Sequence, residues 1–178
     1  MELLKTLYSI YSPSGNEKKM RRFIKRWIMN NVSNTQITTD LKGNIYVIKG
    51  NAENYPCIVS HIDQVQKTHS RDFVCIESED VIFGYSPKNH RQEGLGADDR
   101  AGIFAIIQII KSGLRPSIIL TTDEEKGGLG ASALAEKECP IPNLKYMIQL
   151  DRRGTNDCVF YDCYNPSFIQ YVEEFGFV

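Results

Sequence analysis

Residues 119–130 read ILTTDEEKGGLG, an apolar run that stops at three consecutive carboxylates and is followed almost at once by two glycines. Adjacent carboxylates repel each other, and desolvating each of them costs several kcal/mol unless a cation or a proton compensates. We therefore expect a buried strand that delivers negative charge to its end, beside a compensating cation.

Short apolar runs of the same kind recur at 56–63 (PCIVSHID), 116–124 (PSIILTTDE), 144–151 (LKYMIQLD) and 156–163 (NDCVFYDC). Such runs are typical of strands buried on both faces of a sheet. Helical patterns lie between or after them, at about 99–113, 128–138 and 165–177, the last with Asn165 as cap and Pro166 at its first position. This alternation predicts an α/β sandwich with a largely parallel central sheet, in which ligands bind outside the carboxyl ends of the strands.

The first half of the chain adds helices and antiparallel strands. We expect a short amphipathic helix at the N-terminus and a second helix over 18–32, whose basic residues form a solvated face. Two strands at 35–41 and 44–50 are joined by a tight turn, 71–86 form another hairpin, and 87–94 form a polar loop. No repeat or linker interrupts the sequence, so we expect a single catalytic-type domain over 1–178, without a lid or dimerisation domain.

Composition excludes several classes of function. The chain has 178 residues, 42% of them hydrophobic, and a net charge of -1, which favours neither a nucleic-acid nor a membrane partner. No stretch reaches the roughly 18 apolar residues of a membrane span, and the N-terminus lacks the apolar core of a signal peptide. The five cysteines are odd in number and never spaced as CxxC, which predicts a reducing, cytoplasmic setting.

Chemically reactive side chains collect where the predicted strands end. The first of these strands ends in His61 and Asp63, the second in Asp123, Glu124 and Glu125, and the third in Asp151, while Asp98 and Asp99 precede a helix. If the strands run parallel, these groups meet at one edge of the sheet. Imidazole nitrogen and carboxylate oxygen suit Zn²⁺, with Co²⁺ or Mn²⁺ as alternatives, and no cysteine cluster points to a structural thiolate site.

The spacing of these residues suggests which of them binds a cation, which orients a ligand and which accepts a proton. His61 and Asp63 are two apart, so on a strand they point the same way, and Asp63 can orient the imidazole. Of the adjacent Glu124 and Glu125, one can bind a cation while the other accepts a proton from an activated water. Taken singly, each residue could instead be a cap, a turn or a satisfied strand end.

Five motifs in this order resemble the co-catalytic zinc exopeptidases of the M20, M28 and M42 type, including peptidase T-like aminopeptidases and carboxypeptidases. The motifs are SPSGNE (12–17), SHIDQV (60–65), GLGADDRAG (94–102), TTDEEKGGLGA (121–131) and QLDRRG (149–154). The resemblance implies a three-layer αβα sandwich with a mostly parallel, mixed central sheet, the phosphorylase/hydrolase-like zinc peptidase fold. It also implies a hydrolase that takes small peptides as substrates.

Carried over by position, the resemblance implies roles for individual residues. His61 and Asp151 would bind the first metal ion, Asp98 would bridge two ions through a cis Asp98–Asp99 peptide, and Glu125 would bind the second. Asp63 and Glu124 would be the catalytic pair, as orienting group and general base. His69 and His90 lie in polar loops and are expected at the surface, whereas Arg152 and Arg153 could line the site or form outer ion pairs.

One family feature is not found: no histidine follows His90, although the family places its last ligand downstream of the Asp151-type position. We therefore expect a fold that is incomplete at the C-terminus, with three consequences left open. The coordination of the second ion could be completed by water or by a neighbouring chain. An exposed sheet edge could favour a homo-oligomer. The chain could also be a non-catalytic, single-metal binding or assembly module. A further alternative is an amidohydrolase of N-acyl amino acids.

Overall fold

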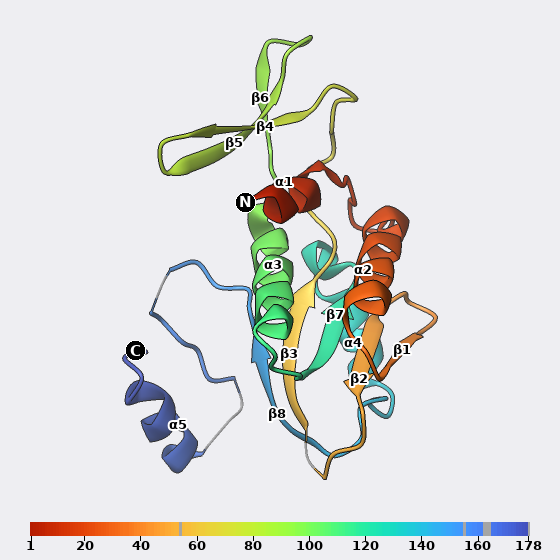
Figure 1. Cartoon of the computed structure of the whole chain (residues 1–178), viewed down its shortest axis with the longest axis vertical. Helices are drawn as coiled ribbons and strands as arrows, with labels where there is room; N and C mark the ends of the chain where they lie inside the picture. The colour runs from red at the N-terminus through yellow and green to blue at the C-terminus, as the bar shows by residue number, and fades with distance from the viewer. Residues whose placement is uncertain (54, 155, 162–164, 178) are drawn as a thin grey trace.

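The computed structural model describes residues 1–53, 55–154, 156–161 and 165–177, which form two sheets and five α-helices (Figure 1). The larger sheet contains, in spatial order, β1 (Thr35–Thr39), β2 (Ile45–Lys49), β7 (Ser117–Thr121), β3 (Tyr55–His61) and β8 (Leu144–Gln149). The three strands β7, β3 and β8 are parallel, whereas β1 and β2 form an antiparallel hairpin that joins β7. The predicted α/β fold is confirmed.

The helices also follow the sequence pattern. They are α1 (Glu2–Ser9), α2 (Lys18–Asn31), α3 (Ala97–Lys111), α4 (Leu129–Ala135) and α5 (Pro166–Glu173), with a single 3₁₀ turn at Glu124–Lys126. At the start of α5 the Asn165 side chain accepts a hydrogen bond from the Phe168 amide, and Pro166 is the first helical residue, as predicted. None of these helices is long and apolar enough to cross a membrane.

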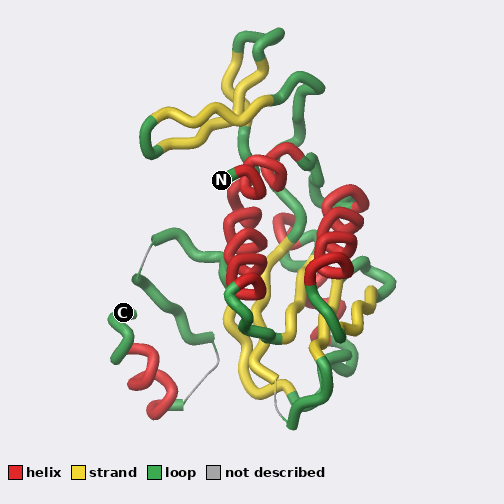
Figure 2. The backbone as a smooth tube through the Cα atoms, viewed as in Figure 1, coloured by secondary structure: helices red, strands yellow, loops and turns green. Residues whose placement is uncertain are grey.

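The central strands are apolar throughout because both faces of the sheet are covered. Along β7, Ile118 and Leu120 belong to one core with α2 and α3, while Ile119 between them belongs to a second core on the opposite face. Successive side chains of a strand point to opposite faces, so a strand between two layers must be apolar at every position. Figure 2 shows the long helices α2 and α3 lying across one face of the strands, and Leu134 of α4 packs on the other core.

A second, antiparallel sheet contains β4 (Val74–Ser78), β5 (Val81–Ser86) and β6 (Arg91–Glu93), and it lies next to α1 (Figure 1). The predicted hairpin at 71–86 is confirmed, but the polar loop expected over 87–94 contains the third strand. Polar residues form this strand because most of them face water, while Glu93 turns inward to accept hydrogen bonds from Ser70. Lys5 of α1 pairs with Glu77 of β4 at 2.7 Å.

Two expectations at the C-terminal end are wrong. The sequence predicts a buried strand at 144–151, but β8 is the last strand of the sheet, and Met147 and Ile148 are 57% and 46% exposed. It also predicts a fourth buried strand at 156–163, yet 156–161 contain no strand, and 162 and 163 lie outside the described residues. Asp157 instead pairs locally with Arg152 at 2.7 Å.

Candidate metal centre

The parallel register of three strands brings the predicted site residues to one end of the sheet. His61 at the end of β3 is paired in register with Thr121 at the end of β7. On the other side Val59 is paired with Gln149, so Asp151, two residues further on, reaches the same level as His61. The Ile62 amide continues the first ladder to the Thr121 carbonyl at 2.9 Å. The carboxyl ends of these strands therefore share one edge, as the sequence predicted.

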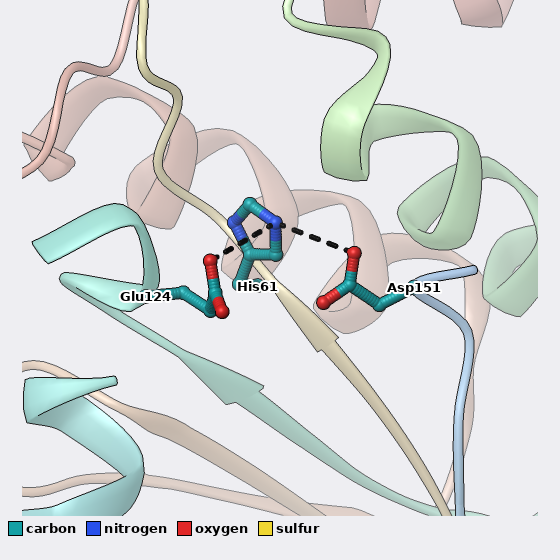
Figure 3. A group of neighbouring side chains, drawn as sticks. All are labelled: His61, Glu124 and Asp151. Atoms are coloured by element: carbon teal, nitrogen blue, oxygen red, sulfur yellow. Dashed lines mark ion pairs between the residues drawn. The ribbon is translucent and has the colours of Figure 1, made fainter. Parts of the chain in front are cut away.

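His61 lies at the centre of the cluster, fully buried. Its Nε2 atom is 2.8 Å from Asp98 Oδ1, 3.8 Å from Asp151 Oδ1 and 3.9 Å from Glu124 Oε2. Figure 3 shows Glu124 and Asp151 on either side of the imidazole, each arriving from a different strand end. Two sets of ligand atoms, each within 4.8 Å of one another, share this ring: His61, Glu124 and Asp151, and His61, Asp98 and Glu125.

Asp63 lies on the other side of the imidazole. Its Oδ1 lies 3.3 Å from His61 Nδ1, and the carboxylate accepts hydrogen bonds from the Ser14 hydroxyl and from the backbone amides of Glu124 and Glu125. Burial acts to raise the pKa of Asp63, but these contacts outweigh it and hold the pKa at about 2. The same buried carboxylate thus lies beside the ring and anchors the loop that carries Glu124 and Glu125.

The loop after β7 is shaped by its backbone. Asp123 has a φ of 51°, in the left-handed region, and the chain then enters the 3₁₀ turn that begins at Glu124. Asn44 forms hydrogen bonds to the backbone on both sides of this turn. Its side-chain oxygen accepts from the Thr122 amide at 3.0 Å, and its side-chain nitrogen donates to the Gly130 carbonyl at 2.9 Å. Both ends of the Glu124–Glu125 segment are therefore anchored to one buried side chain.

Asp98 and Asp99 differ sharply in their surroundings, although they are adjacent. The Asp98–Asp99 peptide bond is cis, as the resemblance implied. The side chain of Asp98 is 69% exposed and points to His61. Asp99 is buried and accepts hydrogen bonds from the Ser60 hydroxyl at 2.6 Å and the Gly102 amide at 2.9 Å. Asp99 therefore supports the site from beneath.

The electrostatics of the cluster call for a cation. Burial raises the pKa of Glu124, Glu125 and Asp151, and neighbouring carboxylates add to the effect. Burial lowers the pKa of His61, but the close carboxylates of Asp63 and Asp98 outweigh it and raise that pKa to about 9. An imidazole nitrogen amid several crowded carboxylates is a donor set that suits Zn²⁺ and related divalent ions. The residues present therefore fit a metal ion.

The residues that hydrogen-bond to the site residues were not predicted from the sequence. The main one is Arg100. Its guanidinium is fully buried and donates to the carbonyl of Asp63 at 2.9 Å, to the carbonyl of Ile10 at 3.2 Å, and to the side chains of Ser12 and Gln64. One signal was available: Arg100 lies three and seven residues before Ile103 and Ile107, on the apolar side of α3. No comparable pattern in the sequence predicted the contacts of Ser14 and Ser60.

The residues predicted at the surface have mixed outcomes. Arg152 forms the outer ion pair with Asp157 described above. His69 is not a free surface residue, because its ring lies between Tyr11 and Phe73 at centroid distances of 5.3 and 4.2 Å. His90 is exposed, as expected. Neither histidine belongs to the metal-binding groups found among the described residues.

Comparison with known proteins identifies the family. Residues 44–172 match the profile of peptidase family M28, which is well over half of the chain. The chain belongs to peptidase family M28. The resemblance to co-catalytic zinc exopeptidases is thereby confirmed, while the roles of the individual residues stay a prediction. A search of curated protein sequences gives no match.

Solved structures of peptidases share the fold of this M28 chain. A tripeptidase from Staphylococcus aureus matches with a TM-score of 0.65, 23% identity, and coverage of 85% of this chain and 42% of that one. The aminopeptidase PepT from Bacillus cereus matches with a TM-score of 0.69 and 20% identity, over 88% of this chain and 44% of that one. The Pyrococcus horikoshii TET1 peptidase matches with a TM-score of 0.55 and 19% identity, over 89% of this chain and 69% of that one. The chain thus spans less than half the length of the first two.

Proposed function

We propose that this chain is a metal-dependent hydrolase of the exopeptidase type that acts on small peptides as a single catalytic-type domain. The observation that carries the proposal is the convergence of His61 Nε2 with carboxylates from three separate segments, those at 98, 124–125 and 151. Membership of a peptidase family supports the same reaction class.

The metal ligands in this proposal are His61, Asp98, Glu125 and Asp151, with Zn²⁺ as the preferred ion and Co²⁺ or Mn²⁺ as alternatives. A divalent ion in such a site would polarise the scissile carbonyl and lower the pKa of a water molecule beside it. Asp63 would keep the His61 ring oriented, since hydrogen bonds from Ser14, Glu124 and Glu125 already fix both of its oxygens.

Glu124 is proposed as the general base. Its carboxylate lies at the mouth of the site, 3.9 Å from His61 Nε2, while its backbone amide is fixed to Asp63. Burial raises the pKa of Glu124, which brings the carboxylate closer to the pH at which it has to accept and return a proton. It would take the proton from the attacking water and pass it to the amine that leaves.

The test is hydrolysis of a panel of dipeptides and tripeptides by the purified chain, with metal content measured on the same samples. With zinc present, we expect Glu124→Gln to lower kcat by about 10²- to 10⁴-fold and to leave bound metal unchanged. Glu125→Gln should instead lower metal occupancy. The exposed Glu136→Gln is the matched control and should change neither.

The two alternative functions predict different results in the same experiment. A non-catalytic binding module would hold at most one ion and show no turnover that depends on Glu124. An amidohydrolase would cleave N-acyl amino acids faster than peptides and would still depend on Glu124. Turnover of free-amine peptides that is unaffected by Glu124→Gln would rule out the proposed mechanism.

We also propose that copies of the chain associate through the edge of the sheet at β8. Met147 and Ile148 on this strand are largely exposed, and the TET1 peptidase, which shares the fold, can assemble into a tetrahedron or a large octahedral shell. Ile148→Glu should then lower the mass measured by light scattering, whereas Leu41→Glu, at a fully exposed position elsewhere, should not.

Four described cysteines are unpaired, which supports a reducing, cytoplasmic setting: Cys57, Cys75, Cys139 and Cys158.

A further inference from the structure

The surface of α2 carries a concentration of positive charge that the proposed reaction does not use. This helix holds six basic residues and no acidic one: Lys18, Lys19, Arg21, Arg22, Lys25 and Arg26. Within the described part of the chain, none of the six forms an ion pair. Basic residues elsewhere do form such pairs, as Lys5 does with Glu77 and Arg152 with Asp157. The nearly neutral net charge of the chain therefore hides a local excess of positive charge on α2.

Five of these residues line one shallow, open groove. A hollow of about 630 Å³ lies between α2 and the end of β1, and it is lined by Lys18, Arg21, Arg22, Lys25, Arg26, Met29, Asn30 and Thr39. Lys25 donates to the Thr39 hydroxyl at 3.2 Å and Arg21 to the Gly43 carbonyl at 3.3 Å, so the floor is tied to the sheet. No carboxylate is among the lining residues.

The helix is electrostatically unfavourable by itself. Lys18 and Arg22, Arg21 and Lys25, and Arg22 and Arg26 are each four residues apart, a spacing at which like charges repel on a helix. An anion in the groove would relieve this repulsion. A negatively charged partner in the groove would therefore be electrostatically favoured.

The adjoining strand indicates which kind of partner fits. β1 is the first strand of the five-stranded sheet and pairs only with β2, so among the described residues no strand lies along its outer edge. Thr39, on the wall of the groove, is the last residue of β1. A free strand edge offers backbone donors and acceptors to an extended polypeptide.

Other anionic partners fit less well. No aromatic ring lines the groove, and stacking on such rings is what usually holds single-stranded nucleic acid. The apolar side of α2 is buried in the core through Met20, Ile24 and Ile28, so it cannot insert into a lipid surface. We propose that the α2–β1 groove binds an extended, acidic polypeptide segment, which pairs with the outer edge of β1 and places its carboxylates against Lys18, Arg22 and Arg26.

The experiment is a fluorescence anisotropy titration of a labelled ten-residue peptide in which Glu and Val alternate. It uses the full chain in the Glu124→Gln background, so that cleavage of the probe does not interfere. Arg22→Glu should weaken binding at least tenfold, because Arg22 lines the groove. Lys19→Glu is the matched control on the same helix: it makes the same charge change outside the groove and should weaken binding less than threefold.

Two further probes separate the components of the site. A peptide with Gln in place of Glu should not bind, and one with N-methyl groups at alternate backbone amides should bind at least tenfold more weakly. Equal losses in Arg22→Glu and Lys19→Glu would overturn the proposal in favour of non-specific attraction. Unchanged binding of the N-methyl peptide, or tighter binding of a single-stranded oligonucleotide or of phosphatidylserine vesicles, would overturn it as well.

The variant itself should fold, since Arg22 is exposed and the introduced carboxylate would lie one turn from both Lys18 and Arg26. A thermal melt followed by circular dichroism checks this point. If Arg22→Glu nevertheless unfolds, Arg26→Glu tests the same wall of the groove against the same Lys19→Glu control. The proposal does not depend on catalysis, so its failure would leave the proposed hydrolase function untouched.

Discussion

The centre of the sheet and its β8 edge contribute residues to the same candidate metal centre but are built very differently. At the centre, Asp63 is fully buried and both of its oxygens are occupied by donors from the chain. At the edge, Asp151 accepts a hydrogen bond from the Gln149 side chain at 2.8 Å and lies 3.8 Å from His61 Nε2, and the strand before it is largely exposed. Buried polar groups survive where their partners are built in, so the centre is preorganised and the edge depends on what binds there.

The junction between the two regions should be the most sensitive point. Gly102 of α3 faces the Leu150 carbonyl, just before Asp151, and a Cβ atom added there would collide with that carbonyl and with the Asp99 carboxylate. We expect Gly102→Ala to destabilise the chain by about 3 kcal/mol, because neither backbone nor buried carboxylate can move aside easily. Urea denaturation measures the change.

A comparison on the same helix makes this prediction strict. Alanine is intrinsically better than glycine inside a helix by about 1 kcal/mol, so propensity alone predicts that Gly102→Ala would stabilise the chain. The reverse change at the exposed neighbour, Ala101→Gly, should cost about that 1 kcal/mol. A Gly102→Ala variant at least as stable as the native chain would show that α3 and the end of β8 are not in close contact.

Removing the charge at the centre should have the next largest effect. In Asp63→Asn, one of the two carboxylate oxygens that accept hydrogen bonds from Ser14, Glu124 and Glu125 becomes an NH₂ donor that faces those donors. Because hydrogen bonds to charged groups contribute about 1.5–3 kcal/mol each, we expect a loss of at least about 2 kcal/mol. Asp157→Asn, which removes an exposed ion pair, should cost less than about 1 kcal/mol. Similar losses in the two variants would contradict the contrast between centre and edge.

The sequence was sufficient for the centre because the centre follows local rules. The apolar run that ends in Asp123, Glu124 and Glu125 specified a doubly covered strand, and the two-residue spacing of His61 and Asp63 brought them onto one side. Parallel pairing then aligned both strand ends. These inferences use only strand periodicity and the general location of sites in α/β sheets.

The edge could not be predicted in the same way. Apolar runs such as Tyr146–Ile148 look the same whether a further layer covers them or not, so burial depends on neighbours that local sequence does not encode. The run at 156–161 also matches a buried strand by its local pattern, yet it forms no strand. Arg100 and Ser14 were missed because their partners, Asp63 among them, lie 37 and 49 residues away in the chain.

The anchoring of the loop that carries Glu124 and Glu125 offers a third, smaller test at the centre. Asn44→Ala removes the bonds to Thr122 and Gly130, and we expect a loss of about 1–2 kcal/mol in stability. If Asn44 positions Glu124, kcat for peptides should fall about tenfold while KM changes little. Asn44→Asp keeps the acceptor for Thr122 but turns a second acceptor toward the Asp40 carboxylate and the Gly130 carbonyl, so it should not recover kcat. A lower stability without any change in kcat would make Asn44 structural only.

The smallest expected change in stability is at the edge, and its sign should depend on metal. Burial raises the pKa of Asp151, and nearby Asp98 adds to it, so in the metal-free protein the folded state disfavours the ionised carboxylate at neutral pH. Asp151→Asn should therefore stabilise the metal-free chain slightly, by less than about 1 kcal/mol. Zinc at tenfold excess over its Kd should stabilise the native chain by about 1.4 kcal/mol. The variant should lose most of this gain, so the two melting curves should exchange order when zinc is added. Curves that keep their order would mean that Asp151 is not a ligand, and that the β8 edge contributes nothing to the metal centre.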